Sequence, residues 1–224
     1  MKINFLTIFP KYYDAFQSES IIAKAIQRKL IDINIIDFRE FTLHKQKKVD
    51  DEIYGGGSGM LLMIEPIDRA LASIKEKTKV ILLTPQGKTF NQKLANELAK
   101  EDSITLIAGR YEGFDERISN LVDEEISIGD YVLTGGELPS MIVADAIIRL
   151  IPNVIKKESF TNDSFQKNLL DYPQYTRPAN YKGMKVPEVL LNGNHKEIEK
   201  WREDMAIKNT KKKRPDLLER TNND

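Results

Sequence analysis

The sequence predicts an α/β fold with a mainly parallel sheet. Continuous apolar runs at residues 79–84, 103–109 and 124–130 are typical of strands that are buried on both faces. Segments with helical spacing of apolar residues separate these runs, so strands alternate with helices along the chain. Such alternation is typical of a doubly wound sheet with helices on both sides.

Each element of this domain has its own signal. The strand-like run KINFLTIF precedes an amphipathic stretch. In this stretch Phe16, Ile22, Ile26 and Leu30 have helical spacing. Pro139 suits the first turn of a helix. The expected elements are, in order, a strand at 2–9, a helix at 14–30, strands at 31–38 and 60–64, a helix from Pro66 to about residue 77, strands at 79–84, 103–109 and 124–130, and helices near 90–100, 115–122 and 139–150.

The pattern changes after Pro152. Residues 152–170 contain no strand-like run, and residues 171–183 are rich in proline and tyrosine. From Val186 onward the sequence looks helical, with an interruption at Asn-Gly-Asn. We therefore expect three parts: a domain at 1–155, a linker at 156–172 and a small all-helical domain at 173–224.

Composition limits the possible chemistry. The 224 residues are 41% hydrophobic and 30% charged, which is ordinary for a globular protein with a real core. There is no cysteine, which excludes disulfides, thiolate metal sites and cysteine nucleophiles. No apolar run reaches the roughly 18 residues that span a bilayer. The N-terminus resembles a first strand more than a signal peptide, so we expect a cytoplasmic location.

A net charge of zero hides an asymmetry between the two ends. Residues 1–155 carry 19 Lys and Arg against 23 Asp and Glu, whereas residues 156–224 carry 15 against 11. The basic end includes the run Lys211–Arg214. This run is either a solvated helix face or a surface that binds the nucleic-acid backbone, and charge does not decide between them.

Several common enzyme classes lack their motifs here. The first strand is followed by FPKYYDAF, without the glycines of a dinucleotide fold, and no P-loop or G-x-S-x-G motif is present. His44 and His195 are far apart in sequence, so a structural zinc site is not expected. Gly135-Gly136 suggests a phosphate cradle, but no lysine follows it and Glu137 would repel a phosphate. Composition alone favours a simple turn at this pair.

Three loops follow consecutive strands: TPQG (84–87), GRYEG (109–113) and GDYVLTGGE (129–137). Ligands of parallel sheets bind at the carboxyl ends of strands, so these loops are expected to converge. Together with YGGGSGM, NDSF, LLDYPQYTRP and VPEVLLNGNHKEIEKWR, they resemble the bacterial tRNA (guanine-N1)-methyltransferase family. The resemblance runs through nearly the whole chain, in the family's order.

The resemblance implies a fold and an activity. The α/β domain would contain a deep trefoil knot of the SPOUT type and bind S-adenosylmethionine there, and the small C-terminal domain would grip tRNA. The enzyme would be a homodimer with shared active sites. It would methylate N1 of the guanosine immediately 3′ of the anticodon, position 37 of tRNA. Mg²⁺ is a further expectation, near Glu112 or Asp163.

The resemblance also assigns the cofactor residues. Glycine allows an adenine ring to approach the backbone directly, and a positively charged sulfonium needs no lysine. Leu82 stands where the family often has tyrosine. The residues that would line the cofactor are Leu83, Pro85, Gly109, Tyr111, Gly113, Ile128, Gly129, Tyr131, Leu133, Gly135 and Gly136.

Catalysis is assigned to Asp163, Arg149 and Glu112. By sequence alone Asp163 is a good helix N-cap with Gln166 in a capping box, and Arg149 suits a helix C-terminus. The resemblance instead makes Asp163 the base for the N1 proton and Arg149 the cation near guanine O6. Glu112 would lie near the guanine, although a local ion pair with Arg110 is the simpler interpretation.

Residues that would contact tRNA come from several segments. Gln174 stands where family members often have histidine. The candidates are Arg110, Ser159, Tyr172, Arg177 and the Lys211–Arg214 run. Two other functions are considered: a ribose 2′-O-methyltransferase of the same knotted fold, and a non-catalytic RNA-binding protein. The linker and the helical tail favour the guanine-specific enzyme.

Overall fold

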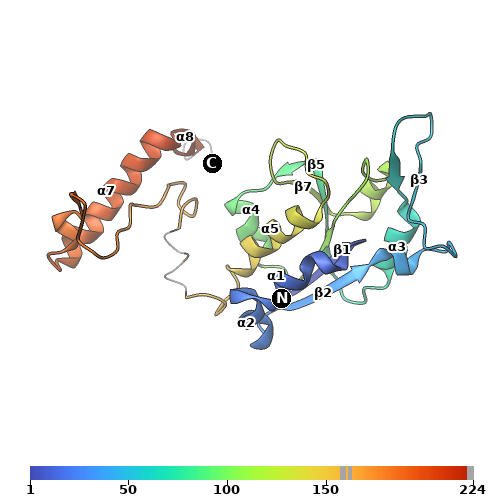
Figure 1. Cartoon of the computed structure of the whole chain (residues 1–224), viewed down its shortest axis with the longest axis horizontal. Helices are drawn as coiled ribbons and strands as arrows, with labels where there is room; N and C mark the ends of the chain where they lie inside the picture. Colours follow the sequence, from blue (N-terminus) through green and yellow to red (C-terminus); the bar gives the residue numbers. More distant parts are fainter. Residues whose placement is uncertain (157–159, 161–162, 221–224) are drawn as a thin grey trace. The chain divides into compact units, whose positions relative to one another are not determined.

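The chain forms two compact units, residues 1–156 and residues 157–224 (Figure 1). The structure is a computed structural model, and it describes residues 1–156, 160 and 163–220.

A five-stranded parallel sheet forms the centre of the first unit. The strand order is β2-β1-β6-β5-β7, and every pairing in it is parallel. This confirms the predicted α/β fold with a mainly parallel sheet. The strands are β1 (Lys2–Thr7), β2 (Asp32–Asp37), β5 (Lys79–Thr89), β6 (Ser103–Ile107) and β7 (Glu124–Ser127).

Helices cover both faces of this sheet, as Figure 1 shows for α1, α2, α4 and α5 on one side and α3 on the other. Successive side chains of a strand point to opposite faces, so Phe5 packs in one hydrophobic cluster and Leu6 in the other. The first cluster receives η1 (Pro10–Tyr13), α1 (Asp14–Ser18), α2 (Ser20–Gln27), α4 (Gln92–Leu98) and α5 (Glu137–Ile148). The second receives η2 (Phe38–Phe41), α3 (Ile64–Ala72) and η3 (Glu116–Leu121).

Several predicted boundaries were wrong for local reasons. The helix expected at 14–30 is two helices, because Glu19 is extended (φ −116°, ψ 153°) and Ser20 has a φ of 57°. The helix expected after Pro66 begins at Ile64, since proline is tolerated in a first turn. The segment expected as a helix at 115–122 is a 3₁₀ helix.

The strand expected at 60–64 lies outside the parallel sheet. It is β4 (Met60–Leu62), and it pairs antiparallel with β3 (Asp50–Glu52) as a separate two-stranded sheet. The β3 sequence, Asp-Asp-Glu, has no apolar residue and therefore gives no strand signal.

The second unit is not all-helical, which corrects the sequence prediction. It contains a hairpin of β8 (Asn180–Tyr181) and β9 (Met184–Lys185), followed by η4 (Glu188–Leu190), α7 (His195–Lys213) and α8 (Asp216–Arg220). Lys182 and Gly183 have φ values of 52° and 86°, as a two-residue hairpin turn requires. Among the described residues of the whole chain, no helix is long and apolar enough to cross a bilayer.

Candidate active site

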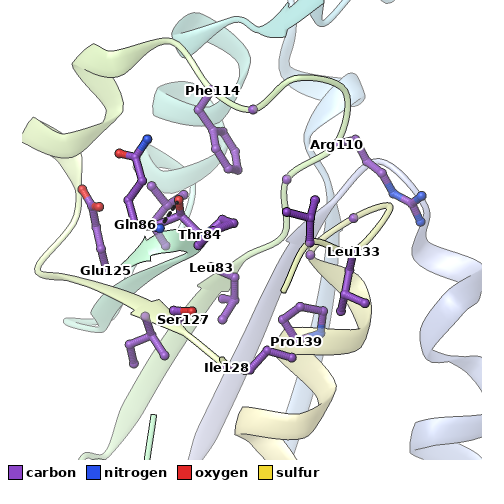
Figure 2. A pocket seen from close by; sticks show the side chains of 18 of the residues that line it. Leu83, Thr84, Gln86, Arg110, Phe114, Glu125, Ser127, Ile128, Leu133 and Pro139 are labelled. Carbon is purple, nitrogen blue, oxygen red and sulfur yellow. Dashed lines mark hydrogen bonds between the residues drawn. The ribbon is translucent and has the colours of Figure 1, made fainter. Parts of the chain in front are cut away.

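A pocket of about 340 Å³ opens beside residues 82–86 of β5 and the carboxyl ends of β6 and β7 (Figure 2). Its size falls in the range of about 300–1,000 Å³ that is usual for small-molecule sites. The lining residues come from three segments, 82–86, 109–119 and 125–139, so the three loops converge as expected. The lining includes every residue that the resemblance assigns to the cofactor: Leu83, Pro85, Gly109, Tyr111, Gly113, Ile128, Gly129, Tyr131, Leu133, Gly135 and Gly136. Their role in binding stays a prediction.

The glycine pair at 135–136 is required by contacts between two loops. The backbone N–H of Gly136 donates to the carbonyl of Gly109 at 2.8 Å. A Cβ at Gly136 would lie 2.6 Å from the backbone nitrogen of Gly109, and a Cβ at Gly135 would lie 2.3 Å from Nε of Arg110. Both distances are shorter than real contacts, so only glycine lets the TGGE loop approach the GRYEG loop this closely.

Gly136→Ala is expected to destabilise the fold by about 1–3 kcal/mol and to weaken the predicted binding of S-adenosylmethionine, because the backbone must move to accept the methyl group. Thermal unfolding and isothermal titration with S-adenosylmethionine measure the two effects. Asp130→Ala is the control, since Asp130 is an exposed residue of the same loop outside the pocket lining. Unchanged stability and affinity in Gly136→Ala would contradict this account of the glycine.

Arg110 and Glu137 form a buried ion pair beside the pocket. Nε of Arg110 donates to Oε2 of Glu137 at 2.9 Å, and the two side chains are 15% and 1% exposed. The hydroxyl of Thr7 donates to the other carboxylate oxygen of Glu137 at 2.9 Å. The predicted local pair of Arg110 with Glu112 is therefore replaced by a pair with Glu137, which is not among the lining residues.

The surroundings of Arg110 keep it charged. Burial acts to lower the pKa of Arg110, but the hydroxyl of Tyr12 and the charge of Glu137 outweigh burial, and the pKa is raised. The guanidinium also lies 4.6 Å from the ring centroid of Phe9 and 5.0 Å from that of Tyr12. The sequence analysis did not identify Glu137 as the partner of Arg110. The only sequence signal for a role of Glu137 was its place as an acidic residue in the first turn of a helix.

The hairpin of β3 and β4 supports the GRYEG loop. The N–H of Glu112 donates to the carbonyl of Met60 at 3.1 Å, and the N–H of Leu62 donates to the carbonyl of Gly113 at 2.9 Å. A Cβ at Gly59 would lie 2.4 Å from Cγ of Glu112, so the YGGGSGM motif touches this candidate residue directly. Glu112 itself is exposed.

Tyr111 has an unusual backbone conformation within this loop. Its φ is 58°, in the left-handed region, and its side chain is 54% exposed. Partial burial, followed by the negative charge of Asp50, raises the pKa of the Tyr111 hydroxyl.

The TPQG segment is a bulge within β5 rather than a loop after it. Leu83 and Lys88 both align with Ile126 of β7, so residues 84–87 bulge out between them and Pro85 reaches the pocket lining. A Cβ at Gly87 would lie 2.4 Å from the backbone nitrogen of Ile126. Gly87 is thus a structural requirement that sequence reasoning did not single out.

The predicted catalytic residues do not all meet in this pocket. Arg149 is the C-cap of α5, at the opposite end from Gly136. The 12 residues of α5 span about 18 Å at 1.5 Å per residue, so Arg149 lies far from the pocket of its own chain. Asp163 belongs to the second unit.

Asp163 begins a series of turns and not the capped helix that its sequence predicts. The N–H of Gln166 donates to the backbone carbonyl of Asp163 at 3.3 Å, and residues 163–168 form turns and bends. The helix expected from the capping pattern is therefore not formed at 163–168.

The tRNA-contact candidates of the second unit have varied surroundings. The guanidinium of Arg202 lies 5.0 Å from the ring centroid of Tyr172. Arg177 is exposed, and Ser159 falls outside the described residues. Arg214 pairs with Asp216 at 2.7 Å, so the basic run at the end of α7 is effectively the exposed Lys211–Lys213.

Within residues 1–156, 160 and 163–220, no group of three histidine or acidic side chains could hold a metal ion. These residues do not form a metal site built by the protein.

Comparisons with known proteins place the chain in a family. Residues 1–220 match the model of the family described as tRNA (Guanine-1)-methyltransferase TrmD. A tRNA (guanine-N(1)-)-methyltransferase of Mycoplasmopsis agalactiae is 68% identical over 226 residues, covering 100% of both chains. Proteins of the same name from Mycoplasmopsis synoviae (65%, 100% of both chains) and Fusobacterium nucleatum (56%, 98% of this chain and 92% of the relative) are also similar. The chain therefore belongs to the tRNA (Guanine-1)-methyltransferase TrmD family.

Proposed function

We propose that the protein transfers a methyl group from S-adenosylmethionine to N1 of the guanosine immediately 3′ of the anticodon, position 37 of tRNA. The observation that supports this most is the convergence of three loops, far apart in sequence, on one glycine-lined pocket in a chain of this family.

The pocket suits a cationic nucleoside better than a phosphate. Its lining belongs entirely to the described first unit and contains one cation, Arg110, which is already paired with Glu137. The carboxylates of Glu112, Glu116 and Glu125 also line the pocket. Apolar side chains, with Leu83, Ile128, Leu133 and Pro139 gathered in Figure 2, would contact the adenosine, and glycine backbone would reach its ring edge.

The chemistry requires a base and a cation. The guanine N1 proton has a pKa well above 7, so the N1 lone pair becomes available only when a base such as Asp163 removes the proton. Loss of that proton places negative charge on O6, where the guanidinium of Arg149 would stabilise it. Glu112 would accept a hydrogen bond from the guanine amino group. S-adenosylmethionine, when bound, supplies an electrophilic methyl group for direct displacement by N1.

These assignments require a second copy of the chain. Leu138 and Ile142 are 52% and 49% exposed, and together with Arg149 they follow the spacing of one helical face of α5. A partner subunit packed on that face would cover the apolar residues and meet Arg149. We therefore propose a homodimer with shared active sites, and the deep trefoil knot of the SPOUT type as the fold of the cofactor loops.

The proposal also includes a metal ion and a location in the cell. Mg²⁺ near Glu112 or Asp163 is expected only by resemblance, and no step above passes through a metal ion. A cytoplasmic location rests on family membership, because the substrate is tRNA.

We propose that Lys211–Lys213, at the C-terminal end of α7, contribute to tRNA binding, together with Tyr172, Arg177 and, outside the described residues, Ser159. Replacing Lys211, Lys212 and Lys213 by glutamine is expected to weaken binding and flatten the dependence of log affinity on log salt, by about 0.7–0.9 for each phosphate that a lysine no longer neutralises. Filter binding over a salt series measures the slope. Lys24, Lys29 and Lys100, which are exposed in the first unit, give a matched triple glutamine control. Equal slopes in the two variants would contradict the proposal.

Labelled S-adenosylmethionine and two anticodon stem-loops test the function. One stem-loop carries guanosine 3′ of the anticodon and the other carries adenosine there. We expect label only in the first. Label in both would indicate a ribose 2′-O-methyltransferase, and binding without label would indicate an RNA-binding protein.

A further inference from the structure

We propose that Arg110 and Glu137 are a pair of positioning residues that hold the cofactor pocket in its binding shape, and that Arg110 does not contact RNA. The inference rests on the proposed function, since S-adenosylmethionine is taken as the ligand of the pocket.

The pair connects three segments that meet at the carboxyl edge of the sheet. Arg110 belongs to the GRYEG loop after β6, and Glu137 is the first residue of α5, directly after the TGGE loop. Nη1 of Arg110 also donates to the carbonyl of Thr134 at 3.1 Å, within the TGGE loop. The third segment follows β1: the Thr7 hydroxyl donates to Glu137 and accepts from the N–H of Phe9 at 2.9 Å.

The hydrogen-bond donors of the Arg110 guanidinium point towards Glu137 and Thr134. Figure 2 shows its side chain pointing away from the apolar side chains of the pocket. The guanidinium lies over the rings of Phe9 and Tyr12, and Nε and Nη1 are engaged by Glu137 and Thr134. An RNA phosphate would have to compete with a carboxylate that is 1% exposed and cannot move into water.

The network fixes the same loop spacing that the glycines allow. Gly135 has no room for a Cβ because Nε of Arg110 lies there, and Gly136 bonds to the carbonyl of Gly109. Loops held in the binding shape before the ligand arrives lose less conformational entropy on binding. Removal of the pair should therefore weaken cofactor affinity while leaving the chemical step intact.

The test compares Glu137→Gln with the double variant Arg110→Met, Glu137→Gln. The single variant leaves a buried cation without its carboxylate and is expected to lower the melting temperature. The double variant removes both charges and is expected to recover most of that loss. In the double variant we still expect the Kd for S-adenosylmethionine to rise about tenfold, with kcat at saturating cofactor and KM for tRNA within about threefold of wild type.

Three results would overturn the proposal. The first is a double variant with recovered stability and wild-type affinity for S-adenosylmethionine, which would mean a purely structural role. The second is an unchanged cofactor Kd with a raised KM for tRNA, which would mean that Arg110 contacts RNA. If the double variant does not fold, Arg110→Lys replaces it, because lysine keeps the charge for Glu137 but lacks the planar fork that also reaches Thr134. The third result is a Kd for S-adenosylmethionine in Arg110→Lys that equals that of the wild-type protein. Failure of the wild-type protein to bind S-adenosylmethionine would instead reject the proposed function.

Discussion

Replacing Asp163 by alanine is expected to slow single-turnover methyl transfer by about 10²–10⁴-fold and to leave the affinity for S-adenosylmethionine unchanged. The reason is that guanine N1 holds a proton at neutral pH, and the pocket in the first unit is lined without any residue of the segment around Asp163. Rapid-quench measurement of the rate and titration with the cofactor separate the two quantities.

The pH dependence of the Asp163→Ala variant gives a sharper test of the base. Guanine N1 deprotonates by itself as the pH rises towards its own pKa, so the variant should recover rate at alkaline pH while wild type changes less. Asp204→Ala is the control, because Asp204 is an exposed residue of the same unit. A near wild-type rate at neutral pH in Asp163→Ala would remove this residue from the mechanism.

Replacing Arg149 by alanine is expected to lower kcat by about 10²–10³-fold, the usual effect of removing one group that stabilises developing negative charge. Cofactor affinity should not change, because Arg149 is proposed to contact the guanine O6 and not the cofactor. The kcat of Arg149→Lys should lie between those of the wild-type protein and Arg149→Ala, since lysine keeps the charge without the guanidinium geometry.

The competing role of Arg149 is the stabilisation of the C-terminus of α5. That role is worth only about 0.3–1 kcal/mol, and its loss would lower the melting temperature slightly without changing kcat. A normal kcat in Arg149→Ala, with or without a change in melting temperature, would therefore contradict the catalytic assignment.

The parallel sheet could be predicted because its strands are unusually clear. Segments such as 79–84 and 103–109 are buried on both faces and read as continuous apolar runs. The rule that ligands bind at the carboxyl ends of parallel strands then predicted which loops would meet. The pocket is lined by those loops.

The contacts that shape the site could not be predicted from local sequence. Glu137 pairs with Arg110 and Thr7, which are 27 and 130 residues away in the sequence. Contacts over such separations produce no periodic pattern in the sequence. Gly87 faces β7 only because β5 bulges between Leu83 and Lys88. Both features depend on which distant segments the fold brings together, and a single sequence does not show this.

The second unit was harder to predict for a related reason. The second unit was expected to be all-helical, but the two-residue strands β8 and β9 are too short to give an alternating pattern. The Lys211–Arg214 run was read as four cations, whereas Arg214 is paired with Asp216 two residues later. Charge counts along the chain do not reveal which cations are already engaged.

Nucleoside analysis of a reacted tRNA tests the central claim most directly. A transcript with guanosine 3′ of the anticodon is incubated with the wild-type protein and S-adenosylmethionine, digested to nucleosides and separated with mass detection. We expect 1-methylguanosine, with the added mass on the base fragment. Methyl on the ribose, methyl on another atom of the base, or unmodified guanosine would contradict the account.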